Sequence, residues 1–420
     1  MGRSRNVLII VENLPVPFDR RTWAEATTLQ KAGYGVSIIC PKGRGAEEGY
    51  VELDGIHIYR HPLPIEARGL FAYPLEYASA LFYQIALTWW IFFRHGFDAI
   101  HACNPPDTIF LIGGFFKLVF GKKFVFDHHD INPELYVAKF GRKDLAYRIL
   151  LGLERWTFRT ADISIATNLS YRRIAIERGR MPPERVFVVR SGPRLEWLVD
   201  VPPAERLKCG RRFLVGYIGV IGDQEGLDLL IDAVRYTVEQ RRRTDVQFMV
   251  IGDGPALKAT IALAERSGVI NYMTFAGRVP DRDVLQMLCT ADVCVNPDRV
   301  NEMNDKSTMN KIMEYMAMGK PIVQFDVTEG RFSALDASLY AKPNDAPDFA
   351  DKILELLDDP QRREVMGAFG RQRARTVLSW EQEGPKLLEA YASVLPLEPM
   401  VSSTIGQWPL RDRAADSKDA

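Results

Sequence analysis

This 420-residue chain lacks clusters of cysteine, and its net charge is zero. The cysteines are scattered and odd in number, and they form no C-x-x-C pair or histidine–cysteine cluster: Cys40, Cys103, Cys209, Cys289 and Cys294. We therefore expect neither a disulfide framework nor a metal site, and a reducing cytoplasm is favoured. The 54 lysines and arginines balance 54 aspartates and glutamates, which argues against nucleic acid as the main partner.

Long hydrophobic runs are also few. One uncharged stretch, 77–93, lies at the bottom of the length range for a membrane span and contains Gln84. It predicts a buried or half-buried helix, or else a helix that presents apolar side chains to a membrane interface beside the basic, aromatic segment 115–123. The apolar run 6–11 is too short for a signal peptide and is interpreted as the first strand. We expect a cytoplasmic protein, with peripheral contact to the inner face of the membrane as the alternative.

Apolar runs alternate with helical stretches along most of the chain. Strands are expected at 7–11, 35–40, 99–102, 123–127, 163–167 and 186–190, and again at 213–218, 247–251, 273–276, 293–296 and 322–325. Strands separated by helices form parallel sheets with right-handed crossovers. The predicted fold class is therefore α/β, with two Rossmann-like, doubly wound parallel-sheet domains at 1–195 and 206–379. The polar, aperiodic end 398–420 is predicted to be disordered.

The segment 301–323 carries the most chemistry. A polar stretch precedes a short helix that Ser307 or Thr308 could cap, and an apolar strand follows. Helical spacing places Asn310, Lys311 and Glu314 together on the first turns. In a parallel sheet this is where ligands bind, and helix N-termini favour anions. A ligand that bears phosphate and a hydroxylated sugar suits such a site; the alternative is a solvated helix start with a routine charge pair.

The same segment resembles a known signature. Residues 314–323 look like the E-A-M-A-x-G-x-P-V-V motif of family 4 retaining glycosyltransferases, and 304–311 look like the N-D-x-S-T-x-N-K variant of its polysaccharide-biosynthesis members. The resemblance implies that Glu314 holds the ribose hydroxyls of a nucleotide-sugar donor, with Asn310 beside it. Many members carry an earlier glutamate near the donor sugar; here that position is Lys306, and Asp305 lies one residue away.

The resemblance also implies an architecture and a donor loop. In the GT-B fold of this family two doubly wound domains face one another across a cleft, the first for the acceptor and the second for the donor. A C-terminal helix, here 380–397, crosses back to the first domain. Residues 217–228 form a strand, a turn with Gly219 and Gly222, and a helix, and they resemble the family's donor-diphosphate loop. An ordinary strand–turn–helix junction is the alternative.

That loop departs from the family pattern in its charges. Val220 and Glu225 stand where an arginine and a lysine are expected to neutralise the diphosphate. The candidate replacements are Lys306, Lys311 and Arg190. Residues 277–280 resemble the loop that contacts the nucleotide base through its backbone, here around Val279, whereas the turn 252–255 is at least as consistent with a structural role.

The acceptor-side candidates follow another strand. Residues 126–134 resemble the family's H-[ED]-x-x-P-E loop, whose histidine faces the donor sugar, and the register favours His129 with Asp130 over His128. A core or capping histidine is the alternative, and metal binding is not expected because adjacent histidines diverge on an extended chain. Arg20 and its neighbours in the first loop are interpreted either as phosphate or sugar contacts or as surface charge.

Together these residues predict a retaining glycosyltransferase of hexosyltransferase type. It would move a sugar from a nucleoside-diphosphate sugar to a glycan or lipid-linked glycan acceptor in cell-surface polysaccharide biosynthesis. His129, Asp130 and Lys311 would act at the reacting centre, and no cofactor beyond the donor substrate is implied. No carboxylate pair demands a covalent intermediate. The alternative is an inactive scaffold of the same fold in a membrane-associated assembly, given the residues at 220, 225 and 306.

Overall fold

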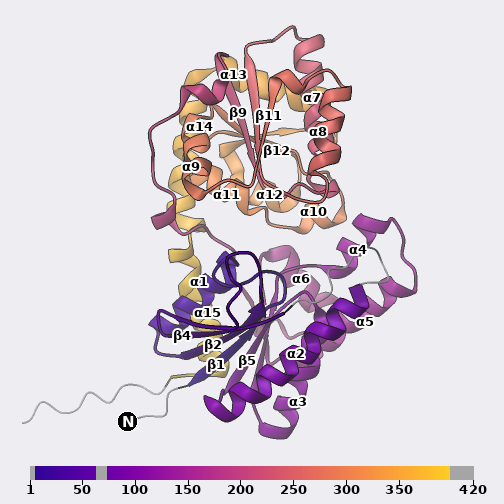
Figure 1. The fold of residues 1–420 in the computed structure, drawn as a ribbon, viewed down its shortest axis with the longest axis vertical. Helices are drawn as coiled ribbons and strands as arrows, with labels where there is room; N and C mark the ends of the chain where they lie inside the picture. The colour runs from indigo at the N-terminus through magenta and orange to yellow at the C-terminus, as the bar shows by residue number, and fades with distance from the viewer. Residues whose placement is uncertain (1–4, 63–72, 398–420) are drawn as a thin grey trace, which may run out of the picture.

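The computed structural model describes residues 5–62 and 73–397 and contains two sheets, one in each half of the chain. The predicted disorder of 398–420 lies outside the described residues. The first sheet has the order β3-β4-β2-β1-β5-β6-β7-β8 and the second the order β11-β10-β9-β12-β13-β14. Figure 1 shows the two sheets, each covered by helices, stacked along the long axis, with α15 running from the second unit to the first.

The first sheet is parallel except for its edge pair β3–β4. Its strands are short and, apart from the edge strands β3 and β8, almost wholly buried, as expected where helices cover both faces. Their bounds are β1 Asn6–Ile10, β2 Gly35–Pro41, β3 Tyr50–Leu53, β4 Ile56–His61, β5 Ala99–Cys103, β6 Lys123–His128, β7 Ile163–Ala166 and β8 Val186–Val188.

Two hydrophobic layers flank this sheet. One is shared with α1 and with α15 from the far end of the chain, and the other with α2, α3, α5 and α6. The helices of the first half are α1 Arg20–Lys31, α2 Tyr73–Arg94, α3 Phe110–Phe120, α4 Asn132–Phe140, α5 Leu145–Thr160 and α6 Leu169–Glu177. The indole nitrogen of Trp380, at the start of α15 Trp380–Val394, donates to the hydroxyl of Thr28 in α1 at 2.9 Å.

The second sheet is parallel throughout and again has a core on each face, one with α7 and α13 and one with α9, α11 and α14. Its strands are β9 Phe213–Ile218, β10 Val246–Ile251, β11 Met273–Gly277, β12 Val293–Asn296, β13 Ile322–Phe325 and β14 Ser338–Ala341. The helices are α7 Leu227–Glu239, α8 Leu257–Arg266, α9 Asp281–Thr290, α10 Glu302–Lys306, α11 Asn310–Ala317, α12 Thr328–Ala334, α13 Ala346–Asp358 and α14 Pro360–Arg373.

The predicted fold class is confirmed, but three strands were missed. β3 and β4 form the one antiparallel strand pair among the described residues, and β14 adds a further edge to the second sheet. Each mixes polar with apolar residues, YVEL, IHIYRH and SLYA, and so lacks the continuous apolar run that marks a central parallel strand. β3 and β14 are edge strands, which need less burial and so give a weaker signal, whereas β4 lies between β3 and β2 and is hidden by its own polar residues.

Two local predictions about helices are also resolved. The expected cap of the 301–323 helix is wrong: α11 begins after Met309 without a side-chain cap, and the preceding residues form α10, which Asn301 caps. The uncharged stretch 77–93 lies within α2, where the buried amide of Gln84 donates to the carboxylate of Glu12. Between residues 5 and 397, apart from 63–72, no helix is long and apolar enough to cross a membrane.

Candidate functional site

The first turn of α11 carries the central candidate residues. The helix buries Ile312, Met313 and Tyr315 against the second sheet, and this orientation leaves Asn310 and Glu314 on its other side. These two residues line a pocket between the halves of the chain. The side chain of Glu314 keeps 23% of its exposure, and its pKa is raised because burial disfavours the charged form, with Arg20 acting in the opposite direction.

Both halves of the chain build this pocket. From the first half come α1 and the segment after β8, and from the second half come α11 and the start of α15: Arg20, Arg21, Ala24, Ser191, Gly192, Pro193, Arg194, Trp197, Leu198, Asn310, Glu314 and Trp380. The guanidinium of Arg20 bridges the two sheets, with Nη1 3.3 Å from Oε1 of Glu314 and Nη2 3.0 Å from Oδ1 of Asp281. The pocket is therefore basic, with indole rings in its wall.

Lys311 does not line this pocket, although its neighbour Asn310 does. Its ammonium is 2.8 Å from Oδ1 of the buried Asp298 and 4.8 Å from the centre of the Tyr217 ring. Burial alone would lower the pKa of Lys311, but Asp298 and Tyr217 raise it above its usual value. The lysine is therefore a fixed cation, and Asp298 balances its charge from below.

The glycine turn after β9 packs against the side chain of Lys311. A Cβ built on Gly219, whose φ is +152°, would lie 3.4 Å from Cε of Lys311. A Cβ on Gly252, whose φ is +148°, would lie 1.8 Å from the carbonyl oxygen of Gly219. The two strand ends approach so closely that neither position accepts a side chain, and the backbone itself forms the surface of the turn.

The departures at positions 220 and 225 lie in the same turn. Val220 is exposed. A Cβ on Gly222 would lie 2.6 Å from Oε2 of Glu225, so this carboxylate folds back under the turn. Burial and the nearby Asp298 raise the pKa of Glu225, which weakens its negative charge beside any anion held above.

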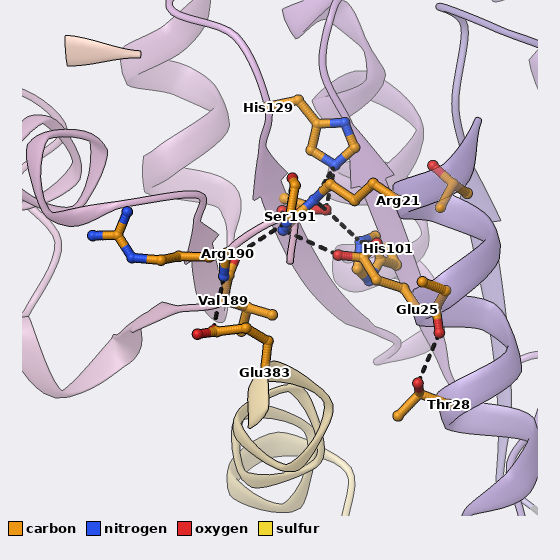
Figure 2. Close-up of polar contacts among 12 residues, drawn as sticks. Arg21, Glu25, Thr28, His101, His129, Val189, Arg190, Ser191 and Glu383 are labelled. Atoms are coloured by element: carbon orange, nitrogen blue, oxygen red, sulfur yellow. Dashed lines mark hydrogen bonds and ion pairs between the residues drawn. The ribbon is translucent and has the colours of Figure 1, made fainter. Parts of the chain in front are cut away.

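A second group of polar residues lies at the carboxyl end of the first sheet (Figure 2). Arg21 donates from Nε to Oδ2 of Asp127 at 3.1 Å and from Nη2 to Oδ1 at 2.8 Å. It also lies 3.0 Å from Oε1 of Glu25 and 3.0 Å from Nε2 of His129, which contacts Asp127 as well. His101 joins Asp127 from below at 3.4 Å. We call these five residues the Arg21 cluster.

The Arg21 cluster holds the imidazole ring of His129 in place through contacts to its Nε2 atom. Burial by itself would raise the pKa of Asp127, but Arg21 and His129 hold it well below its usual value. Burial instead raises the pKa of Glu25 well above its usual value. Cys103 lies close enough to complete a possible metal-ligand set with Glu25, Asp127 and His129. In this arrangement the guanidinium of Arg21 supplies the positive charge, because it already engages both carboxylates.

The two adjacent histidines have separate environments. His128 is fully buried among aromatic rings, and burial lowers its pKa to about 3. His129 points to the opposite face of β6, toward Arg21 (Figure 2). Asp130 follows, with its backbone N–H donating to Oδ1 of Asn104 at 3.1 Å, and burial raises the pKa of its carboxyl group.

The remaining predicted residues lie away from this pocket. Arg190 is buried, its guanidinium 3.3 Å from Glu329 and pointing away from the Arg21 cluster (Figure 2). Lys306 pairs with Glu134 of the first half at 3.2 Å, and Asp305 accepts from the backbone and hydroxyl of Thr328.

Two further predicted residues contribute structure. Val279 packs at the margin of the core around α9 and α11. Gly222 stands before a one-turn helix and has an ordinary negative φ of −123°.

Sequence reasoning missed several residues of the pocket and the cluster. Asp127 and Glu25 stand inside a strand and a helix that read as ordinary core elements. The sequence feature that could have revealed them is a charged residue inside an otherwise apolar run, because a buried charged side chain requires a partner. Trp197 and Trp380 come from segments that gave no local hint of a pocket, because only the chain path brings them there.

Comparison with known proteins gives matches over both halves. A family model described as Glycosyltransferase Family 4 matches residues 19–197, and one described as Glycosyl transferases group 1 matches residues 212–359. The alpha-D-kanosaminyltransferase of Streptomyces kanamyceticus is 28% identical over 192 residues, 45% of this chain and 48% of that protein. The 2-deoxystreptamine glucosyltransferase of the same organism is 25% identical over 51% of this chain and 56% of its own length. The chain spans about half the length of these curated relatives.

Solved structures share the fold over most of the chain. Sucrose-phosphate synthase from Thermosynechococcus elongatus has a TM-score of 0.76 at 17% identity, with 93% of this chain and 98% of that chain covered. HepE from Anabaena, solved in complex with UDP and glucose, has a TM-score of 0.70 at 15% identity and 93% and 100% coverage. At these identities the likeness concerns the fold alone.

Proposed function

The chain belongs to family 4 of the glycosyltransferases and has the GT-B fold, and from this premise we propose that it transfers a sugar from a nucleoside-diphosphate sugar to a glycan or lipid-linked glycan. The observation that carries the proposal is Glu314, a partly buried carboxylate in a basic pocket between the two sheets. Of the structural neighbours, HepE was solved with UDP and with UDP-glucose, which supports a nucleotide sugar as the donor class.

The donor's nucleoside would lie on α11. A carboxylate accepts hydrogen bonds from two vicinal hydroxyls, which suits Glu314 for the ribose, and the amide of Asn310 one turn earlier adds a donor and an acceptor. Arg20 now occupies one oxygen of Glu314. A ribose would therefore compete with Arg20 and release its guanidinium toward the neighbouring phosphate. Val279, on the loop that precedes α9, is the proposed neighbour of the base.

The diphosphate would lie on the turn formed by Gly219 and Gly222. The packed glycine turn exposes backbone rather than side chains, and α7 begins just beyond it with its positive end. Lys311 supplies a fixed positive charge from beneath the turn. Electrostatic stabilisation of the departing diphosphate is then shared between Lys311 and Arg20, in place of the cations that the loop lacks at positions 220 and 225.

His129 would contact the donor sugar. Its Nε2 already faces Asp127 and Arg21, which leaves Nδ1 as the ring nitrogen for a sugar hydroxyl. Asp127 acts on His129 as a positioning residue, because it orients the ring without facing the pocket. Asp130, next to His129, is proposed on the acceptor side, where its raised pKa suits proton exchange with a hydroxyl.

We further propose that transfer retains the anomeric configuration, that the acceptor is a lipid-linked glycan and that the pathway builds a cell-surface polysaccharide. Closure of the two sheets over the donor would exclude water. An inactive scaffold of the same fold is the second candidate, and the observation that favours it is the loss of both loop cations at 220 and 225.

Thermal-shift titration separates these candidates. Wild type would be titrated with UDP, GDP, ADP and dTDP beside Glu314→Gln and a control, Glu265→Gln, on the exposed side of α8. A ligand at about a hundred times its dissociation constant adds about 2.7 kcal/mol of stability. We expect one nucleotide to stabilise wild type and the control but not Glu314→Gln. No shift with any nucleotide would favour the scaffold.

A further inference from the structure

Three neighbouring helices of the first half share a strongly apolar outer surface. The ring of Trp89 in α2 packs against Phe115, Phe116 and Phe120 in α3. The ammonium of Lys117 in α3 donates to a carbonyl oxygen at the end of α5 at 2.8 Å. Figure 1 shows α2, α3 and α5 together on one side of the first sheet, away from α1 and α15.

Large apolar side chains crowd the outside of these helices. Leu118 is 87% exposed and Phe93 78% exposed, values far above those of a half-buried amphipathic helix. Half of the exposed large apolar side chains in the described part of the chain lie on these three helices: Phe82, Ile85, Trp90, Phe93, Leu111, Phe115, Leu118, Val119, Phe120, Leu145, Ile149 and Trp156. So many exposed apolar side chains on neighbouring helices indicate an interaction site.

The charges on and beside these helices are mostly positive. Residues 78–97, 110–123 and 145–160 contain a single acid, Glu154, which is buried and bonded to Arg178. The same ranges contain seven cations: Arg94, Lys117, Lys122, Lys123, Arg148, Arg155 and Arg159. Asp162 and Asp98 pair with two of the lysines from just outside the ranges. In a chain whose total charge is zero, this is a marked local excess of positive charge.

The cations lie beside aromatic rings. The guanidinium of Arg94 is 5.3 Å from the centre of the Trp90 ring, and that of Arg159 is 5.6 Å from the centre of the Trp156 ring. Indole rings flanked by basic side chains match the boundary between headgroups and acyl chains, where the ring meets apolar groups and the cation meets phosphate.

From this placement we propose that α2, α3 and α5 form a surface that docks on an anionic lipid bilayer. Charge complementarity decides the occupant. In a two-fold contact between two copies this surface would meet itself and set cations against cations. An anionic bilayer presents the opposite charge to every cation on the surface and takes up the exposed rings and leucines.

The docked helices lie next to a contact between the two halves of the chain. α5 follows α4 along the chain, and Glu134 of α4 bonds to Lys306 from the second half. A lipid-linked acceptor held in the same bilayer would thus lie close to the second half of the chain at this contact. This last step rests on the proposed function, whereas bilayer docking does not, so vesicle binding and nucleotide binding test the two proposals separately.

The experiment is sedimentation of the full chain with vesicles. Two compositions are compared, phosphatidylcholine alone and phosphatidylcholine with an equal part of phosphatidylglycerol. One variant combines Phe93→Ser with Leu118→Ser, and a matched control combines Val365→Ser with Val377→Ser, exposed apolar positions of the second half. Because all four side chains are exposed, folding is expected to survive, and melting temperatures verify this.

We expect wild type and the control to sediment with anionic vesicles and to dissociate as salt rises, because exposed charges are screened. The Phe93→Ser, Leu118→Ser variant should lose at least about tenfold in partition coefficient, since each lost apolar side chain contributes more than a tenfold factor when buried. Three results would overturn the proposal: wild type that stays in the supernatant, a control that loses as much as the variant, or a wild-type dimer that only this variant dissociates.

A charge variant gives a second readout. Lys123→Gln with Arg155→Gln removes two exposed cations and leaves the apolar surface intact. Docking on anionic lipid predicts that this variant binds less tightly at low salt and depends less steeply on salt than wild type does. Unchanged salt dependence would contradict an electrostatic contribution and overturn the anionic occupant.

Discussion

Asp127→Asn tests how charge is balanced in the Arg21 cluster. Asp127 and Glu25 are both fully buried, and both contact the guanidinium of Arg21. The pKa of Asp127 is lowered and that of Glu25 is raised, and we therefore assign the negative charge beside Arg21 to Asp127 and the proton to Glu25. In this assignment Asp127 is the counter-ion of Arg21.

The expected magnitude follows from this assignment. Removing one partner of a buried ion pair costs about 3–5 kcal/mol. In Asp127→Asn, Glu25 can ionise in its place, because its Oε1 already lies 3.0 Å from Nη2 of Arg21. We therefore expect a loss of about 3 kcal/mol, at the lower end of that range. Glu25→Gln exchanges one neutral group for another and should cost about 1 kcal/mol or less.

The double variant is the decisive measurement. With Asp127→Asn and Glu25→Gln together no carboxylate remains beside Arg21, so the loss should exceed the sum of the single losses by about 1–2 kcal/mol. Urea unfolding at neutral pH, followed by tryptophan fluorescence, gives the four free energies, with Asp336→Asn as an exposed control. The assignment is refuted if Glu25→Gln costs as much as Asp127→Asn, or if the losses simply add.

Three further outcomes are expected. Burial raises the pKa of Glu154 to about 7 from 4.5, so this group's contribution to the free energy of unfolding falls as pH rises through that interval. Between these pH values wild type should lose about 3 kcal/mol relative to Glu154→Gln. Parallel plots of unfolding free energy against pH for the two proteins, measured by urea titration, would contradict this. Gly252→Ala would drive a Cβ into the glycine turn and should reduce the nucleotide-induced thermal shift more than Gly268→Ala. Gly268 also has a positive φ, +69° against +148° for Gly252, but a Cβ there meets open space. Equal shifts would refute the role of the turn. Arg20→Gln removes ion pairs between the two halves of the chain. Because the guanidinium is half exposed, each pair contributes only about 0.2–1 kcal/mol, so the melting temperature should hardly change while the radius of gyration in small-angle scattering rises. An unchanged radius would show that Arg20 does not hold the two sheets together.

The histidine pair shows how far local pattern reaches. Alternation along β6 sends Phe126 and His128 to one face and Asp127 and His129 to the other. The sequence thus separated the two histidines by register. It did not identify Asp127 as the residue that orients His129, because Arg21, the partner that keeps Asp127 ionised, lies 106 residues away along the chain.

The three candidate cations show what the sequence could not distinguish. Lys306, Lys311 and Arg190 were equivalent as sequence candidates, since each is a cation near a strand end. Packing gave each a different carboxylate: Glu134 from the other half for Lys306, the buried Asp298 for Lys311, and Glu329 for Arg190. Of these three, only Lys311 lies beneath the glycine turn.

By itself the sequence determined the alternation of strands and helices, the two parallel sheets and the helix that carries Glu314. These features depend on local periodicity and on short apolar runs, which involve only residues close together in the sequence. Only the tertiary structure decided that Arg20 meets Glu314, that Arg21 joins Asp127, and that α2, α3 and α5 lie together on one side of the first sheet. The physical reason is that a charge or an apolar face takes its role from what packs against it, and these neighbours come from distant parts of the chain.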